Sequence, residues 1–155
     1  MGQMTFFIRA EHCTGCELCQ MACSLSKEME INPSRSRIQV RRMVMDGMMV
    51  PRICLNCSKP ACIAACRRGA ITKDPVNGWV TIDREKCNNC ALCVAACPFS
   101  ALVIAPDKTV LLCDVCGGSP KCAEVCPTGA IRYADRDEGV AGPTDQAAVN
   151  IFEQE

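Results

Sequence analysis

Residues 13–23 read Cys-Thr-Gly-Cys-Glu-Leu-Cys-Gln-Met-Ala-Cys, which places four cysteines within a short loop-sized segment. Working outward, the same spacing recurs at residues 87–97, and two related groups with a longer central gap lie at 54–66 and 113–126. The sixteen cysteines of the chain therefore divide into four groups of four with none left over. The groups are Cys13, Cys16, Cys19 and Cys23; Cys54, Cys57, Cys62 and Cys66; Cys87, Cys90, Cys93 and Cys97; and Cys113, Cys116, Cys122 and Cys126.

The flanks of the cysteine groups repeat as well. Segment 8–13 resembles 82–87 at an offset of 74 residues (13 to 87), and segment 62–71 resembles 122–131 at an offset of 60 residues (62 to 122). Such self-similarity indicates an internal duplication. We therefore predict one domain at 1–134, made of two eight-cysteine halves near 1–75 and 76–134, followed by a tail at 135–155.

The composition argues against several classes of protein. With 17 basic and 17 acidic residues in 155, the chain has no net charge, which disfavours nucleic-acid binding and a polybasic membrane anchor. The apolar run at 6–8 is too short for a signal peptide, and no stretch approaches the roughly 20 apolar residues of a membrane span. We therefore expect a cytoplasmic protein, because in that reducing compartment dense cysteines bind metal more often than they form disulfides.

The spacing itself points to iron–sulfur chemistry. Three cysteines within seven residues suit a loop wrapped around one face of a metal–sulfur cube, and the fourth is placed to ligate a neighbouring cluster. Pro98 and Pro127 follow the last cysteine of their groups, whereas Ser24 and Arg67 take the equivalent positions in the other two. Structural zinc, which favours separated cysteine pairs, and a disulfide framework are the alternatives. The pattern predicts 4Fe–4S clusters bound by all sixteen cysteines.

Between the cysteine groups, apolar and polar residues alternate as they do in short strands. Hairpins are predicted from 71–73 with 79–82, from 101–104 with 109–112, and within an insert at 36–53 that turns at Asp46-Gly47. The segments after Cys19, Cys62, Cys93 and Cys122 are predicted to form one or two helical turns that end near the last cysteine of each group. The predicted fold class is α+β: tandem bacterial-ferredoxin-like modules with short strands, short helices and a hairpin insert, organised around four iron–sulfur clusters.

Several features outside the cysteine groups leave two interpretations open. The five arginines of 35–52 form either a docking patch or a solvated face, and the methionines of that insert form either an adaptable surface or packing over a cluster. His12 is interpreted as a surface residue rather than a tuner of a cluster, and Trp79 as a core residue. The tail at 135–155 is either disordered or an arm that contacts a partner through residues 147–152.

The four motifs, in this order and with the long central gap in the second and fourth, resemble the four-cluster ferredoxin-like electron-transfer subunits. That family includes the iron–sulfur subunits of dimethyl sulfoxide reductase and formate dehydrogenase, and the resemblance covers about residues 5–134. It implies that the first motif shares ligands with the fourth, and the second with the third. The implied ligand sets are Cys13, Cys16, Cys19 and Cys126; Cys113, Cys116, Cys122 and Cys23; Cys54, Cys57, Cys62 and Cys97; and Cys87, Cys90, Cys93 and Cys66.

The resemblance also implies a function. We expect a non-catalytic electron-transfer subunit of a hetero-oligomeric oxidoreductase, whose catalytic subunit is a tungsten- or molybdenum-pterin enzyme of the aldehyde oxidoreductase type. A flavin or ferredoxin protein is the expected second redox partner. A hydrogenase or carbon monoxide dehydrogenase partner and a free soluble polyferredoxin are the alternatives. Because the ligands dominate the interior, we expect that the chain does not fold stably without its clusters.

Overall fold

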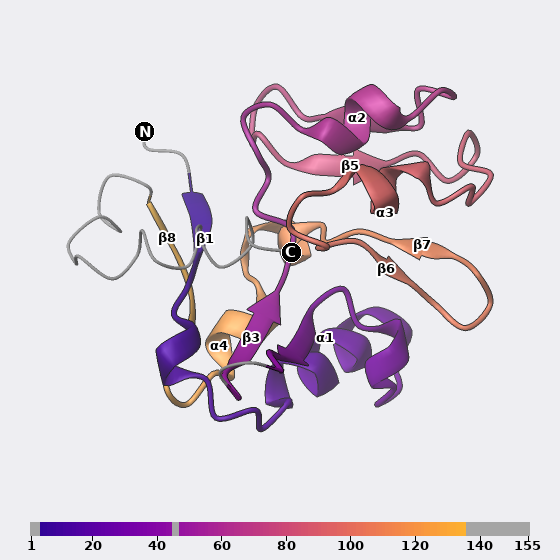
Figure 1. Ribbon diagram of the computed structural model, residues 1–155. Helices are drawn as coiled ribbons and strands as arrows, with labels where there is room; N and C mark the ends of the chain where they lie inside the picture. Colours follow the sequence, from indigo (N-terminus) through magenta and orange to yellow (C-terminus); the bar gives the residue numbers. More distant parts are fainter. Residues whose placement is uncertain (1–3, 45–46, 136–155) are drawn as a thin grey trace.

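The computed structural model describes residues 4–44 and 47–135 of the chain (Figure 1). Over these residues, the strands form four separate two-stranded antiparallel sheets. The strand pairs are β1 (Met4–Ile8) with β8 (Ile131–Asp135), β2 (Gln39–Arg42) with β3 (Met49–Arg52), β4 (Ile71–Lys73) with β5 (Val80–Ile82), and β6 (Val103–Ile104) with β7 (Val110–Leu111). All three predicted hairpins are confirmed as strand pairs. Asp46, in one predicted turn, and residues 136–155 of the predicted tail lie outside the described residues.

Short helices follow the cysteine loops. They are α1 (Leu18–Glu28), α2 (Ala61–Ala65), α3 (Leu92–Ala96) and α4 (Lys121–Glu124), with 3-10 turns η1 (Ala10–His12), η2 (Pro33–Arg35) and η3 (Val115–Gly118). As predicted, α2, α3 and α4 end shortly before Cys66, Cys97 and Cys126. The prediction is wrong for α1, which continues past Cys23 as far as Glu28.

Ser24 explains why α1 continues. Two of the three equivalent positions hold proline, which lacks the backbone N–H that a helix interior requires and disfavours helical backbone in the residue before it. Ser24 has its N–H and is completely buried. Its hydroxyl donates to the carbonyl of Met21 (3.1 Å) and accepts from the backbone N–H of Asn32 (3.0 Å). The serine therefore holds the returning chain against α1 as well as allowing the helix to extend.

The internal duplication is visible in the strand pairing. Ile71 lies opposite Ile82 in the β4–β5 sheet, and the residues one repeat away, Ile131 and Ile8, lie opposite each other in the β8–β1 sheet. The β1–β8 pair was not predicted, although the two sequence offsets taken together indicate it. This sheet brings the two ends of the described chain side by side (Figure 1).

The helices pair as the strands β1 with β8 and β4 with β5 do. α1 packs against α4, and α2 packs against α3. Elements from the first and fourth cysteine groups thus lie together in one part of the molecule, and those from the second and third lie together in the other (Figure 1). The mixed helix-and-sheet architecture agrees with the predicted α+β class.

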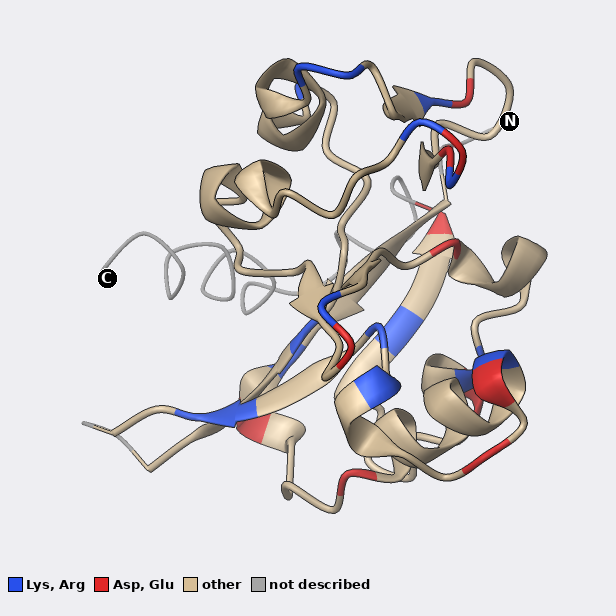
Figure 2. Cartoon of the chain, turned by 90° about the vertical axis from the view of Figure 1, so that its right-hand side faces the viewer, with Lys and Arg blue, Asp and Glu red and all other residues tan. Residues whose placement is uncertain are grey.

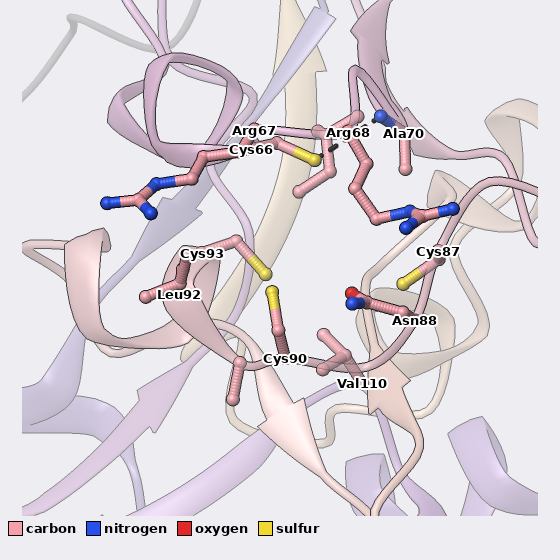
Figure 3. Close-up of a pocket in the computed structure, with 12 residues that line it drawn as sticks. Cys66, Arg67, Arg68, Ala70, Cys87, Asn88, Cys90, Leu92, Cys93 and Val110 are labelled. Carbon is pink, nitrogen blue, oxygen red and sulfur yellow. Dashed lines mark hydrogen bonds between the residues drawn. The ribbon is translucent and has the colours of Figure 1, made fainter.

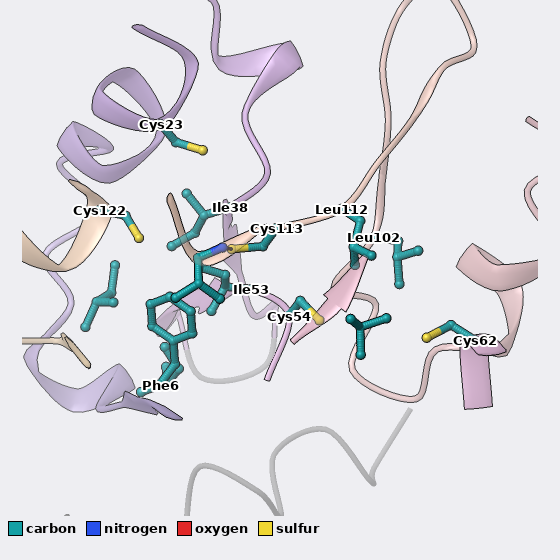
Figure 4. Packing of buried hydrophobic residues seen from close by; sticks show 14 of the residues in the cluster. Phe6, Cys23, Ile38, Ile53, Cys54, Cys62, Leu102, Leu112, Cys113 and Cys122 are labelled. Carbon is teal, nitrogen blue, oxygen red and sulfur yellow. Dashed lines mark hydrogen bonds between the residues drawn. The ribbon is translucent and has the colours of Figure 1, made fainter. Parts of the chain in front are cut away.

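The interior is narrow and rich in sulfur. Seven of the described cysteines are buried, and they pack among small aliphatic side chains such as Ile38 and Val115, both fully buried. Figure 4 shows Cys54 and Cys113 in the middle of this cluster, between Cys23 and Cys122 on one side and Cys62 on the other. Trp79 packs against the cluster from its edge, in agreement with the prediction of a core residue, and His12 is exposed at the end of η1.

The β2–β3 insert packs over the first cysteine loop. Ile38 and Val50 are buried, and the backbone N–H of Val40 donates to Oε1 of Gln20 on α1 at 2.9 Å. Met49 lies so close to Gly15 that a Cβ at Gly15 would stand 2.9 Å from its Cγ. Of the two interpretations of the insert's methionines, packing over a cysteine loop is therefore confirmed for Met49.

The arginines of this insert have mixed roles. Arg37 and Arg35 both pair with Glu28 of α1, at 2.6 and 3.3 Å, and Arg35 also reaches Asp107 in the β6–β7 loop at 2.8 Å. Asp107 lies in the part of the fold that holds the second and third cysteine groups, whereas Arg35 lies in the part that holds the first and fourth. The ion pair between them therefore connects these two parts. Arg41 and Arg42 are exposed on β2.

Candidate metal centres

One cavity is lined by four cysteines from two motifs. Its volume is about 160 Å³, and Cys87, Cys90 and Cys93 of the third group border it together with Cys66 of the second. Figure 3 shows these four sulfur atoms around the cavity. The α3 loop supplies three of them and the end of α2 supplies the fourth, because α2 packs against α3.

A second cavity has the corresponding arrangement at the opposite part of the fold. It is smaller, about 20 Å³, and Cys13, Cys16 and Cys19 of the first group border it together with Cys126 of the fourth. Val40 and Pro51 of the β2–β3 insert form part of its wall. The insert therefore closes over this site.

The other eight cysteines also gather across motifs, as their electrostatics show. Burial, together with the nearby thiolates of Cys57, Cys62 and Cys97, raises the pKa of Cys54 to about 12, although a hydrogen bond from the backbone of Asn56 opposes the shift. Burial likewise raises the pKa of Cys113 well above its usual value, with Cys122 and Cys23 among its charged neighbours. The pKa of Cys122 is raised first by burial, then by Cys23 and Cys116. Cys54, Cys57 and Cys62 thus have Cys97 of the third motif as a neighbour, and Cys113, Cys116 and Cys122 have Cys23 of the first.

The same electrostatic neighbours give the order of the four sets. Besides the members of its own set, Cys19 is a charged neighbour of Cys122. Cys54 is a charged neighbour of Cys113, and Cys62 is a charged neighbour of Cys93. These neighbour relations link the Cys13 set to the Cys113 set, the Cys113 set to the Cys54 set, and the Cys54 set to the Cys87 set.

Backbone N–H groups point at many of these sulfur atoms. The residue four places after the last cysteine donates at two sites, Ala70 to Cys66 (3.3 Å) and Ala101 to Cys97 (3.5 Å). At Cys23 the helix continues instead, and the N–H of Arg37, from the insert, donates at 3.3 Å. Although burial opposes it, the N–H groups of Ala70 and its neighbours Arg68, Gly69 and Ile71 lower the pKa of Cys66, because hydrogen bonds favour the thiolate.

The sequence analysis missed the residue two places after the first cysteine of each motif. Gly15, Asn56, Asn89 and Val115 occupy this position, and all four have positive φ (73°, 50°, 56° and 56°). Glycine and asparagine adopt this backbone most readily, so the recurring Gly or Asn was an available signal. The two asparagine side chains also accept from strand N–H groups, Asn56 from Val80 (2.9 Å) and Asn89 from Val110 (3.1 Å), which fixes each loop on a hairpin.

Two lysines place positive charge beside the Cys113 set and the Cys54 set. Lys27 of α1 pairs with Asp114 at 2.7 Å, and the Cys116 thiolate is a further cause of its raised pKa, although burial opposes the shift. Lys73 donates to the carbonyl of Cys57 at 2.8 Å, and its charge offsets part of the burial that raises the pKa of that thiol.

The residues fit a metal–sulfur cluster better than a single ion. Within residues 4–44 and 47–135, no three His, Cys, Asp or Glu side chains are grouped closely enough to hold one metal ion. A zinc ion requires its sulfur ligands about 2.3 Å from a single point, whereas the cavity of about 160 Å³ at the Cys87 set is large enough for a group the size of benzene, which fits a cavity of roughly 150 Å³. Packing four thiolates together in a buried site is unfavourable until a cationic metal core neutralises them.

Comparison with known proteins identifies the chain. The cysteine loops, short helices and paired hairpins define an iron–sulfur protein of the ferredoxin class. A family described as the 4Fe-4S dicluster domain matches residues 45–136, more than half of the chain, and the chain belongs to this family. It therefore binds 4Fe–4S clusters.

The relatives are subunits of oxidoreductases. The polyferredoxin-like subunit of an aliphatic sulfonate oxidoreductase from Pyrococcus furiosus is 42% identical over 120 residues, covering 77% of this chain and 69% of that protein. The thiosulfate reductase electron transfer subunit PhsB of Salmonella typhi is 32% identical over 142 residues, covering 83% and 73%. A chain of the active site complex BamBC of benzoyl coenzyme A reductase superposes with a TM-score of 0.52 at 28% identity, over 86% of this chain and 77% of that one. The chain is thus an iron–sulfur electron-transfer subunit rather than a catalytic one, as predicted.

No helix among the described residues is both long and apolar enough to cross a lipid bilayer.

Proposed function

We propose that the domain at 1–134 holds four 4Fe–4S clusters in a row and relays electrons between a catalytic oxidoreductase subunit and a second redox protein in the cytoplasm. The observation that supports this proposal is that a cysteine of each set is a charged neighbour of a cysteine in the next set: Cys19 of Cys122, Cys54 of Cys113, and Cys62 of Cys93. When bound, each cluster would take up and release one electron, so a row of sites defines a path. A scattered arrangement of the same ligands would not.

The proposed ligand sets are those of the cross-motif arrangement. Cys126 would complete the Cys13 set, Cys23 the Cys113 set, Cys97 the Cys54 set and Cys66 the Cys87 set. In each case the fourth ligand lies in or just after the helix that packs against the helix of the three-cysteine group. Exchange of ligands between motifs keeps neighbouring sites close together.

The remaining residues of the chain insulate and tune the proposed sites. Apolar residues such as Ile38 exclude water from the Cys54 and Cys113 sets, which reduces the screening of charge there. Backbone N–H groups and the ammonium groups of Lys27 and Lys73 stabilise added negative charge, so they favour the reduced form of the nearest site.

For the catalytic partner, we propose a tungsten- or molybdenum-pterin enzyme of the aldehyde oxidoreductase type within a hetero-oligomer. The support is the motif resemblance, together with relatives that are named as subunits of reductases and oxidoreductases.

The experiment is anaerobic co-purification of the tagged chain from its native host, with metal analysis of each component. We expect about sixteen irons per chain, four for each of four clusters, and tungsten or molybdenum in a stoichiometric partner. About sixteen irons in a chain that purifies alone would favour a free polyferredoxin. Half that iron would contradict four clusters, and zinc in place of iron would overturn the cofactor assignment.

A further inference from the structure

The two ends of the row of cysteine sets carry equivalent exposed residues. Cys16 and Cys90, related by the 74-residue repeat (16 to 90), are both exposed. So are Leu18 and Leu92, also one repeat apart, at 43% and 42% exposure. An exposed ligand beside an exposed leucine is suited to a small docking contact, because the apolar residue excludes water where a partner must approach closely. Each end therefore offers the same apolar centre.

The charges around these two centres differ. Arg67 and Arg68 border the cavity of the Cys87 set, whereas the charged residue that borders the cavity of the Cys13 set is Glu17. The repeat places Pro127 and Thr128 where the arginines would be, and Ala91 where the glutamate would be. The backbone is nevertheless alike, since Glu17 and Ala91 have φ of 59° and 60°. The duplicated ends thus share a shape and differ in charge.

The two arginines are available to a partner. Both are exposed, and in the part of the chain that the structure describes neither pairs with a carboxylate. The Nε of Arg68 donates to the carbonyl of Lys86 at 2.8 Å, which holds its guanidinium at the edge of the cavity (Figure 3). The basic segment after α2 lies at the top of the view in Figure 2. This rim is therefore a local positive feature on a chain without net charge.

We propose that the rim formed by Arg67, Arg68 and Leu92 is the docking surface for a small acidic one-electron carrier protein of the ferredoxin class. The inference rests on the proposed relay and names the partner at one of its ends. Positive charge around an exposed electron-transfer site steers an acidic carrier toward it and orients its approach. One electron passes between the carrier and this end, no covalent bond forms or breaks, and no proton is transferred. At the rim of the Cys13 cavity, the carboxylate of Glu17 opposes the approach of the same carrier.

Binding of an acidic two-cluster bacterial ferredoxin to the cluster-loaded full chain tests this proposal. The dissociation constant is measured anaerobically by calorimetry at about 20 mM and about 200 mM salt, and the rate of electron transfer by stopped flow. At low salt, Arg67→Gln with Arg68→Gln should weaken binding about tenfold and flatten its salt dependence. Glu17→Gln, the matched control at the duplicated end, should stay within about twofold of the unaltered chain.

Two further variants separate charge from structure. Arg67→Lys with Arg68→Lys keeps both charges and should retain most of the affinity, and Arg67→Gln alone is a milder change at an exposed side chain. Iron content and the electron paramagnetic resonance spectrum of each protein establish that its clusters are intact. Unchanged binding in the iron-replete double Gln variant would overturn the docking surface and leave the relay standing, as would a larger effect of Glu17→Gln. A deficit of iron in the unaltered chain would instead contradict the relay itself.

Discussion

The backbone N–H of Arg37 donates to Sγ of Cys23 across 3.3 Å. At two other motifs the corresponding bond comes from a residue four places after the cysteine, Ala70 or Ala101. In the first motif that position lies inside α1, whose N–H groups bond within the helix. The returning chain at the start of the insert replaces the missing donor, so the longer helix and the insert compensate for each other.

Removal of this single donor should lower the reduction potential of the site that includes Cys23. Arg37→Pro lacks the N–H, and the preceding Ser36 already has the extended backbone that precedes proline (φ −74°, ψ 143°). A hydrogen bond to a charged acceptor contributes roughly 1.5 kcal/mol, so we expect a shift of about 60 mV in a redox titration followed by electron paramagnetic resonance. Arg37→Ala keeps the N–H and loses the side-chain contacts, which are the ion pair with Glu28 and the hydrogen bond to the carbonyl of Arg35, so it is the control. Equal shifts in both variants would assign the effect to charge.

Proline should be tolerated after one cysteine and not after another. Ser24→Pro interrupts α1 and removes two hydrogen bonds, so we expect a loss of about 3 kcal/mol in the free energy of unfolding. Arg67→Pro lies at the equivalent position, but α2 has already ended at Ala65 and Cys66 is extended (φ −81°, ψ 91°), so its effect should be small. Anaerobic urea unfolding followed by cluster absorbance compares the two. Similar destabilisation by both would refute this account of Ser24.

A serine at Cys66 should damage the site of another motif. If Cys66 completes the Cys87 set, Cys66→Ser converts or empties that terminal cluster and spares the one held by Cys54, Cys57 and Cys62. Mössbauer spectra and iron analysis should show a loss of between about one and four irons. Cys97→Ser is the counterpart and should affect the Cys54 set instead. Identical spectra from the two variants would argue against ligand exchange.

The ion pair between Arg35 and Asp107 should contribute stability that depends on pH. The hydrogen bond from Arg35, the hydrogen bonds from Thr109 and the charge of Arg35 together hold the pKa of Asp107 at about 2, below its ordinary value of 3.8. A lowered folded-state pKa means that the contribution is complete above the unfolded pKa and is lost as pH falls toward about 2. Asp107→Asn should therefore be slightly less stable than the unaltered chain at neutral pH, and the difference should shrink below about pH 4. If the difference in the free energy of unfolding between the two proteins stayed constant below about pH 4, titration of Asp107 would be excluded as its cause.

Removal of the clusters should unfold the chain. Buried cysteines make up much of the core, and four like-charged thiolates at one site repel each other unless metal neutralises them. Anaerobic chelation should abolish the dispersion of amide resonances and reduce the helical circular dichroism. Addition of iron and sulfide should restore both. A chelated chain that kept its native spectrum would show that the polypeptide packs without metal.

Much of the local structure could be read from the chain because short-range rules govern it. The alternating segments on either side of Asn77-Gly78 predicted the β4–β5 hairpin, and Pro98 and Pro127 marked positions beyond which a helix does not continue. The extension of α1 escaped prediction because Ser24 permits a helix without requiring one. Its buried contact with Asn32 decides the matter, and that contact depends on where the returning chain lies.

Cofactor chemistry, four-fold cysteine grouping and internal duplication were determined by the sequence itself, since they depend on residue type and spacing. Only the tertiary structure decided which groups lie together. The pairing of β1 with β8 and the packing of α1 against α4 close the chain on itself, which brings cysteines of different groups together and leaves arginines at the rim of one cavity and a glutamate at the rim of the other. Spacing along a chain specifies a loop, whereas the neighbours of that loop depend on long-range packing, which no local pattern of cysteines contains.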